Sequence, residues 1–526
     1  HLQIFFYTLI ASAAYLLFRS FQEGKKLRIP FPFFACFLLF ILISAVQWFP
    51  FFEFVSRSAR GLDQIGILKE GWFIPWQHLI QFVVPDFFGN PATLNYWGVW
   101  NYAELVGYIG IVPLTFALFS IRVKEKKVLF FWLLTIISLV FALPNFISKL
   151  PYDLGLPLIS TSQPTRLLFI ITFSLSILSA FGLDHFIKSK EKKSIVPFLE
   201  VLAIILLLFA ISYFGIYKTD SQNLLVAKRN TMLPFVIAFV SCVLAFSHII
   251  ASDKKLKRAI IVGLLAITVF DLFRFGWKFT PFTPKEYLFP ETKTTRFLKE
   301  NIGNYRMMSA DPRIFPPNFP AYYKLQSIEG YDPLYLRNYG ELIIAIKRDK
   351  PDIAPPFDFN RIVAPYDPSD RIIDLMGVKY VLSLEEIDLP KLEKVFEEEQ
   401  TKVYENKNVL PRAFFVEKLN FVNNKKEAIE LLMNESFDPK KEAVVEEKLT
   451  QDITTGETEI LEYSQNKIRL QTRNEGDGFL LLTDNYYPSW KVKIDNKKSE
   501  IYITDFSFRG VFVPKGEHIV EFYATL

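Results

Sequence analysis

Long apolar runs dominate the first half of the chain. Eight of them are long enough to cross a lipid bilayer, which takes about 20 residues per helix. Runs of this length are too numerous to be the buried helices of a soluble protein. We therefore expect a polytopic α-helical membrane bundle. The runs lie near residues 3–18, 30–51, 103–121, 128–147, 167–187, 195–217, 231–251 and 259–277.

Positive charges follow every second run, in clusters of four. Cytoplasmic loops carry an excess of Lys and Arg, so these clusters predict the cytoplasmic side. The alternate loops, near 52–102, 148–166 and 218–230, and everything after residue 278 are then extracytoplasmic. The clusters are Arg19, Lys25, Lys26 and Arg28; Arg122, Lys124, Lys126 and Lys127; Lys188, Lys190, Lys192 and Lys193; and Lys254, Lys255, Lys257 and Arg258.

The two halves of the chain differ in charge. Residues 1–275 hold 25 Lys and Arg against 14 Asp and Glu, whereas residues 276–526 hold 35 against 41. A basic membrane region is followed by a mildly acidic soluble region, and the overall charge of +5 is an average of the two. It gives no reason to expect a nucleic-acid partner.

The soluble half changes character near residue 438. Short strand-like and helix-like stretches alternate over residues 279–437, for example "YRMMSA", "VKYVLS" and "NKKEAIELLMNES", which predicts a mixed α/β domain. Residues 438–526 alternate apolar and polar residues, as in "KIRLQTR" and "WKVKID", with turns such as "DNKK" and "PKGEH". Period-2 alternation with closely spaced turns predicts an antiparallel β-sandwich. The bundle itself is assigned to residues 1–278.

The stretch "GWFIPWQHLIQFVVPDFFGNP", residues 71–91, is apolar but contains three prolines and two tryptophans. A lipid-crossing helix does not tolerate this composition, whereas tryptophan is enriched at headgroup level. We predict that residues 52–102 form short helices at the outer membrane surface. The two cysteines, Cys36 and Cys242, are expected to be apolar fillers within spans, and no Cys–His cluster has zinc spacing.

Several blocks of the chain resemble the bacterial YfhO-type multispan membrane proteins. They include "HLQIFFY", "LISAVQWFP", "VPDFFGNP", "SQPTRLLFI", "LPRAFFV" and the C-terminal "GFLLLTDNYYPSWKVKIDNKK" with "PKGEHIVEFYA". The chain departs from the family pattern at Ser489 and Asn496, where the family usually has glycine and an Asp-Gly pair. The resemblance runs through the chain in order.

This resemblance implies a membrane glycosyltransferase of the GT-C superfamily. Such enzymes move a sugar from a polyprenyl-phosphate carrier to an extracytoplasmic acceptor, here a cell-wall or surface polymer of a bacterium. The family's catalytic carboxylate usually lies near the true N-terminus, so we expect this chain to be a fragment truncated at both ends. No cofactor is evident; a divalent metal is possible but no ligand pattern supports it.

Sugar transfer from a lipid phosphate needs cations for the leaving group and a carboxylate for the acceptor proton. The outer-side cations are Arg166, at the start of the fifth span, and Arg57 and Arg60, which share a helix face if their stretch is helical. Arginine suits phosphate because its planar fork binds two oxygens. The alternatives are a headgroup anchor for Arg166 and a solvated loop for the other two.

The candidate carboxylates are Asp86 and Glu104. Asp86 has apolar neighbours in "VPDFFGN", so we expect partial desolvation and a raised pKa, as a base requires; it could equally cap a turn. Glu104 starts the third span and could face the same cavity. His78 is expected to be a polar anchor rather than a base.

Two further groups are considered. Tyr486, Tyr487 and Trp490 can stack on sugar rings, although Trp490 is in register with core residues of its strand. Asp271 and Arg274 lie three apart within the last span, where an ion pair locking the helix to the bundle is the simpler interpretation.

Two other functions remain open. A transporter or flippase of lipid-linked glycans would be expected to show charges within the spans and paired broken helices, whereas the mid-span regions here are nearly free of charge. A non-catalytic assembly protein would use its outer domain to grip a cell-envelope glycan.

Overall fold

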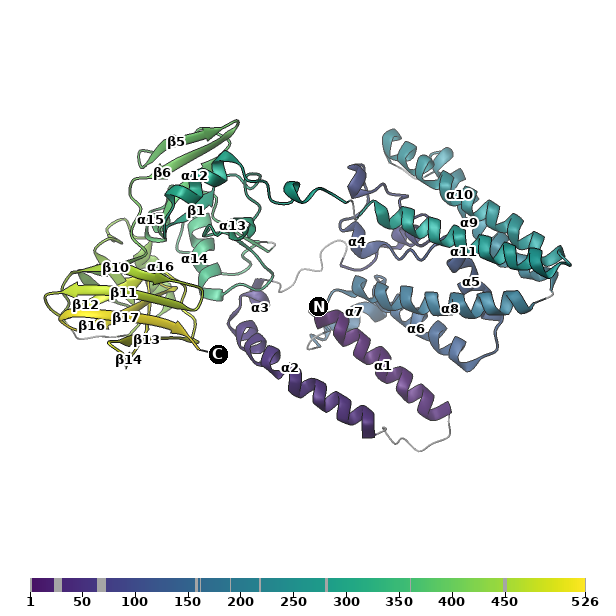
Figure 1. Ribbon diagram of the computed structural model, residues 1–526, viewed down its shortest axis with the longest axis horizontal. Coiled ribbons are helices and arrows are strands. Elements are labelled where there is room, and N and C mark those ends of the chain that lie inside the picture. Colours follow the sequence, from purple (N-terminus) through teal and green to yellow (C-terminus); the bar gives the residue numbers. More distant parts are fainter. Residues whose placement is uncertain are drawn as a thin grey trace. The chain divides into compact units, whose positions relative to one another are not determined.

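The computed structural model describes residues 2–22, 31–63, 72–156, 159–160, 162–189, 191–216, 219–279, 282–359, 361–447 and 452–525. Four basic residues of the predicted charge pattern, Lys25, Lys26, Arg28 and Lys190, lie outside these ranges. The chain forms two compact units. The helical unit comprises His1–Cys36 with Ile67–Phe282, and the β-rich unit comprises Phe37–Gly66 with Thr283–Leu526 (Figure 1).

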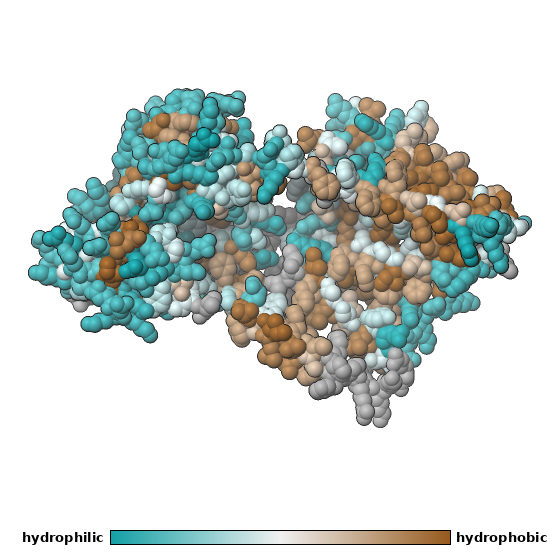
Figure 2. All heavy atoms as spheres, viewed as in Figure 1, coloured by the Kyte–Doolittle hydropathy of each residue, from teal (hydrophilic) through white to brown (hydrophobic). Residues whose placement is uncertain are grey.

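Apolar helices of span length make up most of the first half. Six described helices are long and apolar enough to cross a membrane. A seventh candidate is a pair of helices, α6 and α7, bent by 64° at a short break. Brown, hydrophobic residues cover much of the helical elements in Figure 2, as expected of surfaces that face lipid. The long helices are α1 (Leu2–Gln22), α2 (Phe31–Arg57), α6 (Lys126–Ala142) with α7 (Phe146–Asp153), α8 (Leu168–Lys188), α9 (Val196–Tyr213), α10 (Ser221–Ile250) and α11 (Lys254–Trp277).

The predicted third span, 103–121, is not one long helix. It divides into α4 (Tyr102–Leu105) and the nine-residue α5 (Ile111–Phe119), which continues as a 3-10 turn, η3 (Ser120–Arg122). Gly110 precedes α5 at φ +94°, a conformation that favours glycine and interrupts a helix. Most of α5 is buried against α8, α9, α10 and α11. Its apolar composition therefore reflects packing between helices, which the sequence does not distinguish from contact with lipid.

The predicted surface segment, 52–102, begins with the last residues of α2, and its other described residues contain only short helices. After α2 ends come α3 (Arg60–Asp63), the 3-10 helices η1 (Trp76–Phe82) and η2 (Pro91–Thr93), and α4. Ile74 donates its amide to Ala142 O at 2.8 Å, which attaches the segment to α6. The described residues 58–63 and 72–102 thus form short helices and no further span, whereas residues 64–71 lie outside the described residues and the place of the segment at a membrane surface stays a prediction.

The β-rich unit contains two sheets that pack face to face. A five-stranded antiparallel sheet has the order β10-β11-β17-β13-β14, and a six-stranded sheet has the order β7-β12-β16-β15-β9-β8. Inward side chains of both, such as Leu470, Leu480, Val511 and Phe522, form one buried cluster. The strands are β7 (Ala413–Val416), β8 (Lys418–Phe421), β9 (Glu442–Val445), β10 (Gly456–Tyr463), β11 (Lys467–Asn474), β12 (Gly478–Leu482), β13 (Trp490–Ile494), β14 (Lys497–Ser499), β15 (Tyr502–Thr504), β16 (Phe508–Val513) and β17 (Gly516–Ala524).

The six-stranded sheet takes strands from both sides of residue 438. β7 and β8 precede this position and pair with β12 and β9, which follow it. The β8–β9 pair is parallel and is connected through α16 (Lys425–Leu432), whereas the other described pairs of both sheets are antiparallel. The sandwich therefore needs residues that precede its all-β sequence, because strand pairing depends on tertiary contacts.

The rest of the β-rich unit is built around a four-stranded sheet of order β1-β4-β6-β5. The predicted stretches "YRMMSA" and "VKYVLS" form two of its strands, "TKVYEN" forms a third, and "ETKTTRFLKEN" forms a helix capped by the Thr292 side chain. These elements are β1 (Arg306–Ser309), β4 (Val378–Ser383), β5 (Leu392–Glu398), β6 (Thr401–Asn406), α12 (Lys293–Asn301) and α14 (Arg337–Arg348).

A close approach of α8 to α5 gives a testable consequence. A Cβ at Gly182 would lie 1.8 Å from Phe116 O, whereas a Cβ at Gly263 would meet only Leu244 Cδ1 at 3.8 Å. Gly182→Ala should therefore destabilise the protein by about 1–3 kcal/mol. Gly263→Ala should be neutral or stabilising, because alanine favours helix. The measurement is the midpoint of thermal unfolding of the detergent-purified protein; equal midpoints for the two variants would contradict this packing.

A buried carboxyl group predicts a pH dependence of stability. Asp505 is fully buried, its Oδ1 accepts the Val444 amide at 2.7 Å, and its Oδ2 has no partner among the described residues. Burial raises its pKa to about 7 from an ordinary value of 3.8. The folded state therefore binds this proton more tightly than the unfolded state does. The resulting contribution to the free energy of unfolding is complete below pH 4 and is lost as pH rises through 7.

Asp505→Asn should remove this dependence. Between pH 5 and pH 8 the wild type should lose roughly 2–3 kcal/mol of unfolding free energy more than the variant. Glu329, whose pKa burial also raises to about 7, is common to both proteins and cancels in the comparison. Denaturant titrations at the two pH values test this; parallel losses in both proteins would show that Asp505 does not titrate.

Candidate functional site

Asp86 is enclosed by donors at one end of the helical unit. Its side chain is only 3% exposed. Oδ1 accepts hydrogen bonds from the Tyr102 hydroxyl at 2.7 Å and from Asn90 Nδ2 at 2.8 Å, and Oδ2 lies 2.5 Å from Lys278 Nζ. The carboxylate thus ties the 71–91 segment to α4 and to the end of α11. Of the two interpretations of Asp86, a carboxylate committed to three donors favours the structural one over a base.

His78 is also part of the packing. It is fully buried, and its ring stacks on Phe88 with centroids 4.6 Å apart. The Val99 amide donates to Nε2 at 3.2 Å, so Nδ1 carries the hydrogen and donates to Gln81 Oε1 at 2.5 Å. Both ring nitrogens therefore hold neighbouring backbone and side-chain groups of the segment, which is consistent with an anchoring role.

Glu104 and Arg166 are brought together. Glu104 lies on α4, and Arg166 lies on η4 (Pro164–Leu167), the 3-10 turn that leads into α8. Arg166 Nη2 is 3.6 Å from Glu104 Oε1, which is an ion pair but longer than a hydrogen bond. The Thr165 hydroxyl donates to Glu104 Oε2 at 3.2 Å, and Arg166 Nη1 donates to Gln3 Oε1 of α1 at 3.1 Å.

The Glu104–Arg166 pair is partly exposed and adjoins an apolar cluster. Both side chains remain partly exposed, 27% for Glu104 and 19% for Arg166. Ile74 of the 71–91 segment belongs to the same apolar cluster as Leu105 and Leu168, which flank the two charged residues in sequence. A carboxylate, a guanidinium and an apolar cluster therefore meet at the head of α8.

Arg57 and Arg60 do not share a helix face. α2 ends at Arg57, and Arg60 begins the separate helix α3. Between them Ser58 pairs with Leu336 as an isolated β-bridge, and the Ala59 amide donates to Tyr335 O at 3.1 Å. The Arg57 side chain is half-exposed and pairs with Glu53 at 3.6 Å. A solvent-exposed ion pair of this kind contributes little to stability. A joint cationic face required a continuous helix through both residues, and the helix is interrupted between them where Ser58 and Ala59 pair with residues 335–336.

The last-span pair is also different from expectation. Asp271 accepts the Tyr108 hydroxyl at 2.5 Å and the Ile111 amide at 3.1 Å, rather than forming an ion pair with Arg274. It therefore attaches α11 to the first turn of α5. Asp271 therefore holds the last span to the bundle, as predicted. Its partners are the Tyr108 hydroxyl and the first amide of α5 instead of Arg274.

The predicted sugar-binding aromatics lead to a pocket that the sequence did not indicate. Trp490 and Tyr487 line an open pocket of about 690 Å³ in the β-rich unit, whereas Tyr486 does not. Trp490 is half-buried, with one edge against the sandwich core, as its register predicted. We call this cavity the arginine pocket, because Arg306, Arg412 and Arg509 line it.

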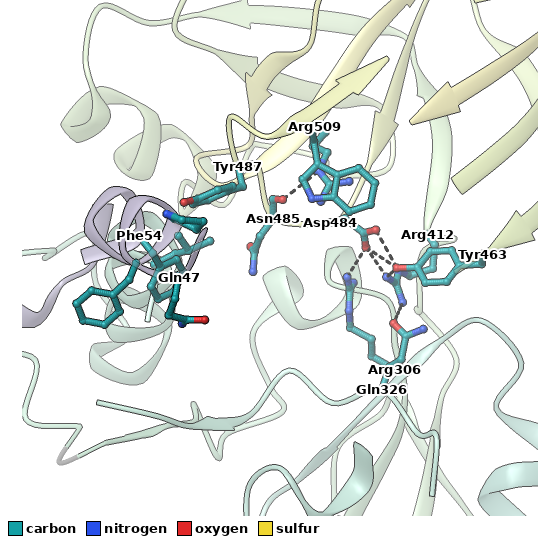
Figure 3. Close-up of a pocket in the computed structure, with 14 residues that line it drawn as sticks. Gln47, Phe54, Arg306, Gln326, Arg412, Tyr463, Asp484, Asn485, Tyr487 and Arg509 are labelled. Atoms are coloured by element: carbon teal, nitrogen blue, oxygen red, sulfur yellow. Dashed lines mark hydrogen bonds and ion pairs between the residues drawn. The ribbon is translucent and has the colours of Figure 1, made fainter. Parts of the chain in front are cut away.

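Asp484 is the electrostatic centre of the arginine pocket. Figure 3 shows Arg306, Arg412 and Tyr463 directed toward its carboxylate. Arg306 Nη2 donates to Oδ1 at 2.8 Å, the Tyr463 hydroxyl donates to Oδ2 at 2.8 Å, and Arg412 Nη2 also contacts Oδ1. Burial by itself would raise the pKa of Asp484, but the neighbouring arginines outweigh burial and hold the pKa at about 2.

The three arginines of the pocket differ in how many hydrogen bonds they donate. Arg306 and Arg412 also donate to backbone carbonyls, such as Met376 O at 2.6 Å and Asn304 O at 3.0 Å. Arg509 stacks on the Trp490 ring, with Cζ 3.8 Å from the ring centroid, and among the described residues it donates only from Nε, to Asn485 O at 3.0 Å. Burial lowers the pKa of Arg509 to about 10, so the group is still cationic at neutral pH.

Sequence reasoning missed this pocket because its charges are far apart in the chain. Arg306 and Arg412 lie at the starts of β1 and β7, Asp484 follows β12, and Arg509 lies within β16. A usable signal was present: each charge adjoins a strand of almost uniformly buried residues, where an unpaired charge is costly. Such charges must find one another in the folded protein.

No group of three or more His, Cys, Asp or Glu side chains within the described ranges is arranged to hold a metal ion. Comparisons with family models, with curated proteins and with solved structures find no match to this chain.

Proposed function

We propose that the protein is a membrane glycosyltransferase of GT-C type, which moves a sugar from a polyprenyl-phosphate carrier to a cell-envelope acceptor outside a bacterial cell. The observation that supports this best is the Glu104–Arg166 pair at the head of α8, beside the apolar 71–91 segment. A base and a phosphate-binding cation are adjacent there, next to helices long and apolar enough to span a bilayer.

In this proposal Glu104 is the general base. The acceptor hydroxyl oxygen forms a bond to the anomeric carbon of the sugar while its proton passes to the Glu104 carboxylate. The bond between the anomeric carbon and the carrier phosphate breaks, and the phosphate leaves with the electron pair. Arg166 stabilises the negative charge of the leaving phosphate. Glu104 suits this role better than Asp86, whose oxygens already accept from three donors.

The catalytic role of Glu104 has a direct test. Glu104→Gln retains the shape of the side chain but cannot accept the proton, so sugar transfer by the full-length protein should fall by on the order of 100-fold or more. Asp153→Asn, an exposed carboxylate from another loop of the same predicted face, is the matched control and should leave the rate unchanged. Retention of activity by Glu104→Gln, with the variant folded, would exclude Glu104 as the base.

Arg166 should determine affinity for the carrier. Arg166→Ala removes the cation and should weaken binding of a polyprenyl-phosphate sugar by roughly tenfold or more. Arg166→Lys should restore only part of the affinity, because lysine cannot bind two phosphate oxygens with a planar fork.

Arg57→Ala is the comparison for this experiment, since Arg57 is half-exposed and pairs with Glu53. It should change affinity by less than about twofold, as expected for a solvated surface pair. The measurement is carrier binding to the full-length protein in detergent micelles. If Arg166→Ala binds as tightly as the wild type, Arg166 is a headgroup anchor.

A further inference from the structure

The arginine pocket carries more positive charge than its own residues neutralise. Among the fourteen lining residues, all of which the structure describes, Arg306, Arg412 and Arg509 face a single carboxylate, Asp484. Tyr463 does not add negative charge, because burial raises its pKa to about 12. The formal charge of the lining is therefore +2, inside a protein interior where unpaired charge is expensive.

Specific donors in this pocket have no acceptor. Arg509 is 4% exposed, and its only hydrogen bond leaves both terminal nitrogens without a partner among the described residues. Buried Arg509 Nη1 and Arg412 Nε are unsatisfied. Buried polar groups without partners are rare in native proteins, and cationic ones are the most costly. One buried N–H of each of these two arginines therefore lacks an acceptor beside the same pocket, which points to an anionic ligand.

The chemistry of the donors favours phosphate. Guanidinium groups bind phosphate oxygens through paired, charge-assisted hydrogen bonds. A phosphate diester or monoester supplies one or two negative charges, which matches the excess of the lining. Asn485 and Gln326 add neutral polar groups at the same wall.

The opposite wall indicates where the phosphate comes from. Pro50, Phe51 and Phe54 of α2 line the pocket, and Phe54 lies 6.1 Å from Tyr487, ring centroid to ring centroid. These residues occupy the last turns of a candidate span, Phe34–Arg57. An apolar wall that continues into a span-length helix suits a ligand with a lipid tail better than a fully soluble anion.

We propose that the arginine pocket is a second lipid-phosphate site, in which Arg509, beside Arg306 and Arg412, binds the phosphate head of an anionic membrane lipid and Phe51 and Phe54 of α2 contact its apolar part. This site does not involve Glu104 or Arg166 and does not depend on the proposed transferase activity. Its ligand can be a structural lipid or a substrate; both present the same phosphate and tail.

The test measures binding of short-chain lipids to the full-length protein in a non-ionic detergent. The probes are dihexanoyl phosphatidic acid, the matched zwitterionic dihexanoyl phosphatidylcholine, inorganic phosphate and a soluble glycerol-phosphate oligomer. All proteins carry Arg166→Ala, so that the proposed carrier site does not contribute. Phosphatidic acid should bind at least about tenfold more tightly than the other three probes, because it alone has both an unmasked negative charge and a tail.

The decisive variant is Arg509→Gln, because Arg509 makes a single hydrogen bond and its loss disturbs the backbone least. It should weaken phosphatidic acid binding by about tenfold or more. Arg473→Gln removes the same charge from an exposed site on β11 and should change affinity by less than about twofold. Phe54→Gln should weaken phosphatidic acid binding while leaving the weaker binding of inorganic phosphate unchanged.

Three outcomes would overturn the proposal. The first is equal affinity of Arg509→Gln and its parent, with equal thermal midpoints. The second is binding of inorganic phosphate or the glycerol-phosphate oligomer as tight as that of phosphatidic acid, which would indicate a soluble anion. If Arg509→Gln does not fold, the parent protein supplies the test, because phosphatidic acid should raise its thermal midpoint with increasing concentration. The third outcome is a thermal midpoint of the parent that phosphatidic acid does not raise.

Discussion

The packing of the sheets in the β-rich unit depends on the ion pairs and hydrogen bonds of the Asp484 carboxylate. Its partners come from three sheets: Arg306 from β1 of the four-stranded sheet, Tyr463 from β10 of the five-stranded sheet, and Arg412 beside β7 of the six-stranded sheet. Breaking a buried ion pair by removing one partner leaves an uncompensated charge and costs several kcal/mol. The carboxylate therefore holds the separate layers in one arrangement, and its own charge is maintained by the arginines.

Charge balance distinguishes this cluster from those of the helical unit. There, Asp86 has Lys278, and Glu104 has Arg166, so each cation is matched by one carboxylate. The arginine pocket has three cations for one carboxylate. Matched pairs position segments of the chain, whereas an unmatched, partly unsatisfied cluster is the kind of site that an added anion completes.

The sandwich and the part of α2 that belongs to the same β-rich unit use apolar residues differently. In the sandwich, apolar side chains such as Leu470 and Val511 point inward and are fully buried. On α2, large apolar side chains such as Val46 and Phe49 are more than three-quarters exposed. A surface of that kind is stable only against another apolar phase or partner. This contrast supports membrane localisation, and the pocket lies where the exposed apolar helix meets the β-rich unit's charged residues within one compact unit.

The sequence by itself determined the local elements of this protein. Apolar runs predicted long helices, and alternation predicted β11 and β13, because side-chain period is a local property. Tertiary structure alone decided that α5 is a short buried helix, that β7 to β9 complete the sandwich, and that Arg57 and Arg60 lie on separate helices. It also assembled the arginine pocket, since Arg306 and Arg509 are about two hundred residues apart and each is, by its local pattern, only a charge beside a strand. Contacts of such sequence separation depend on how the layers pack, which no local pattern encodes.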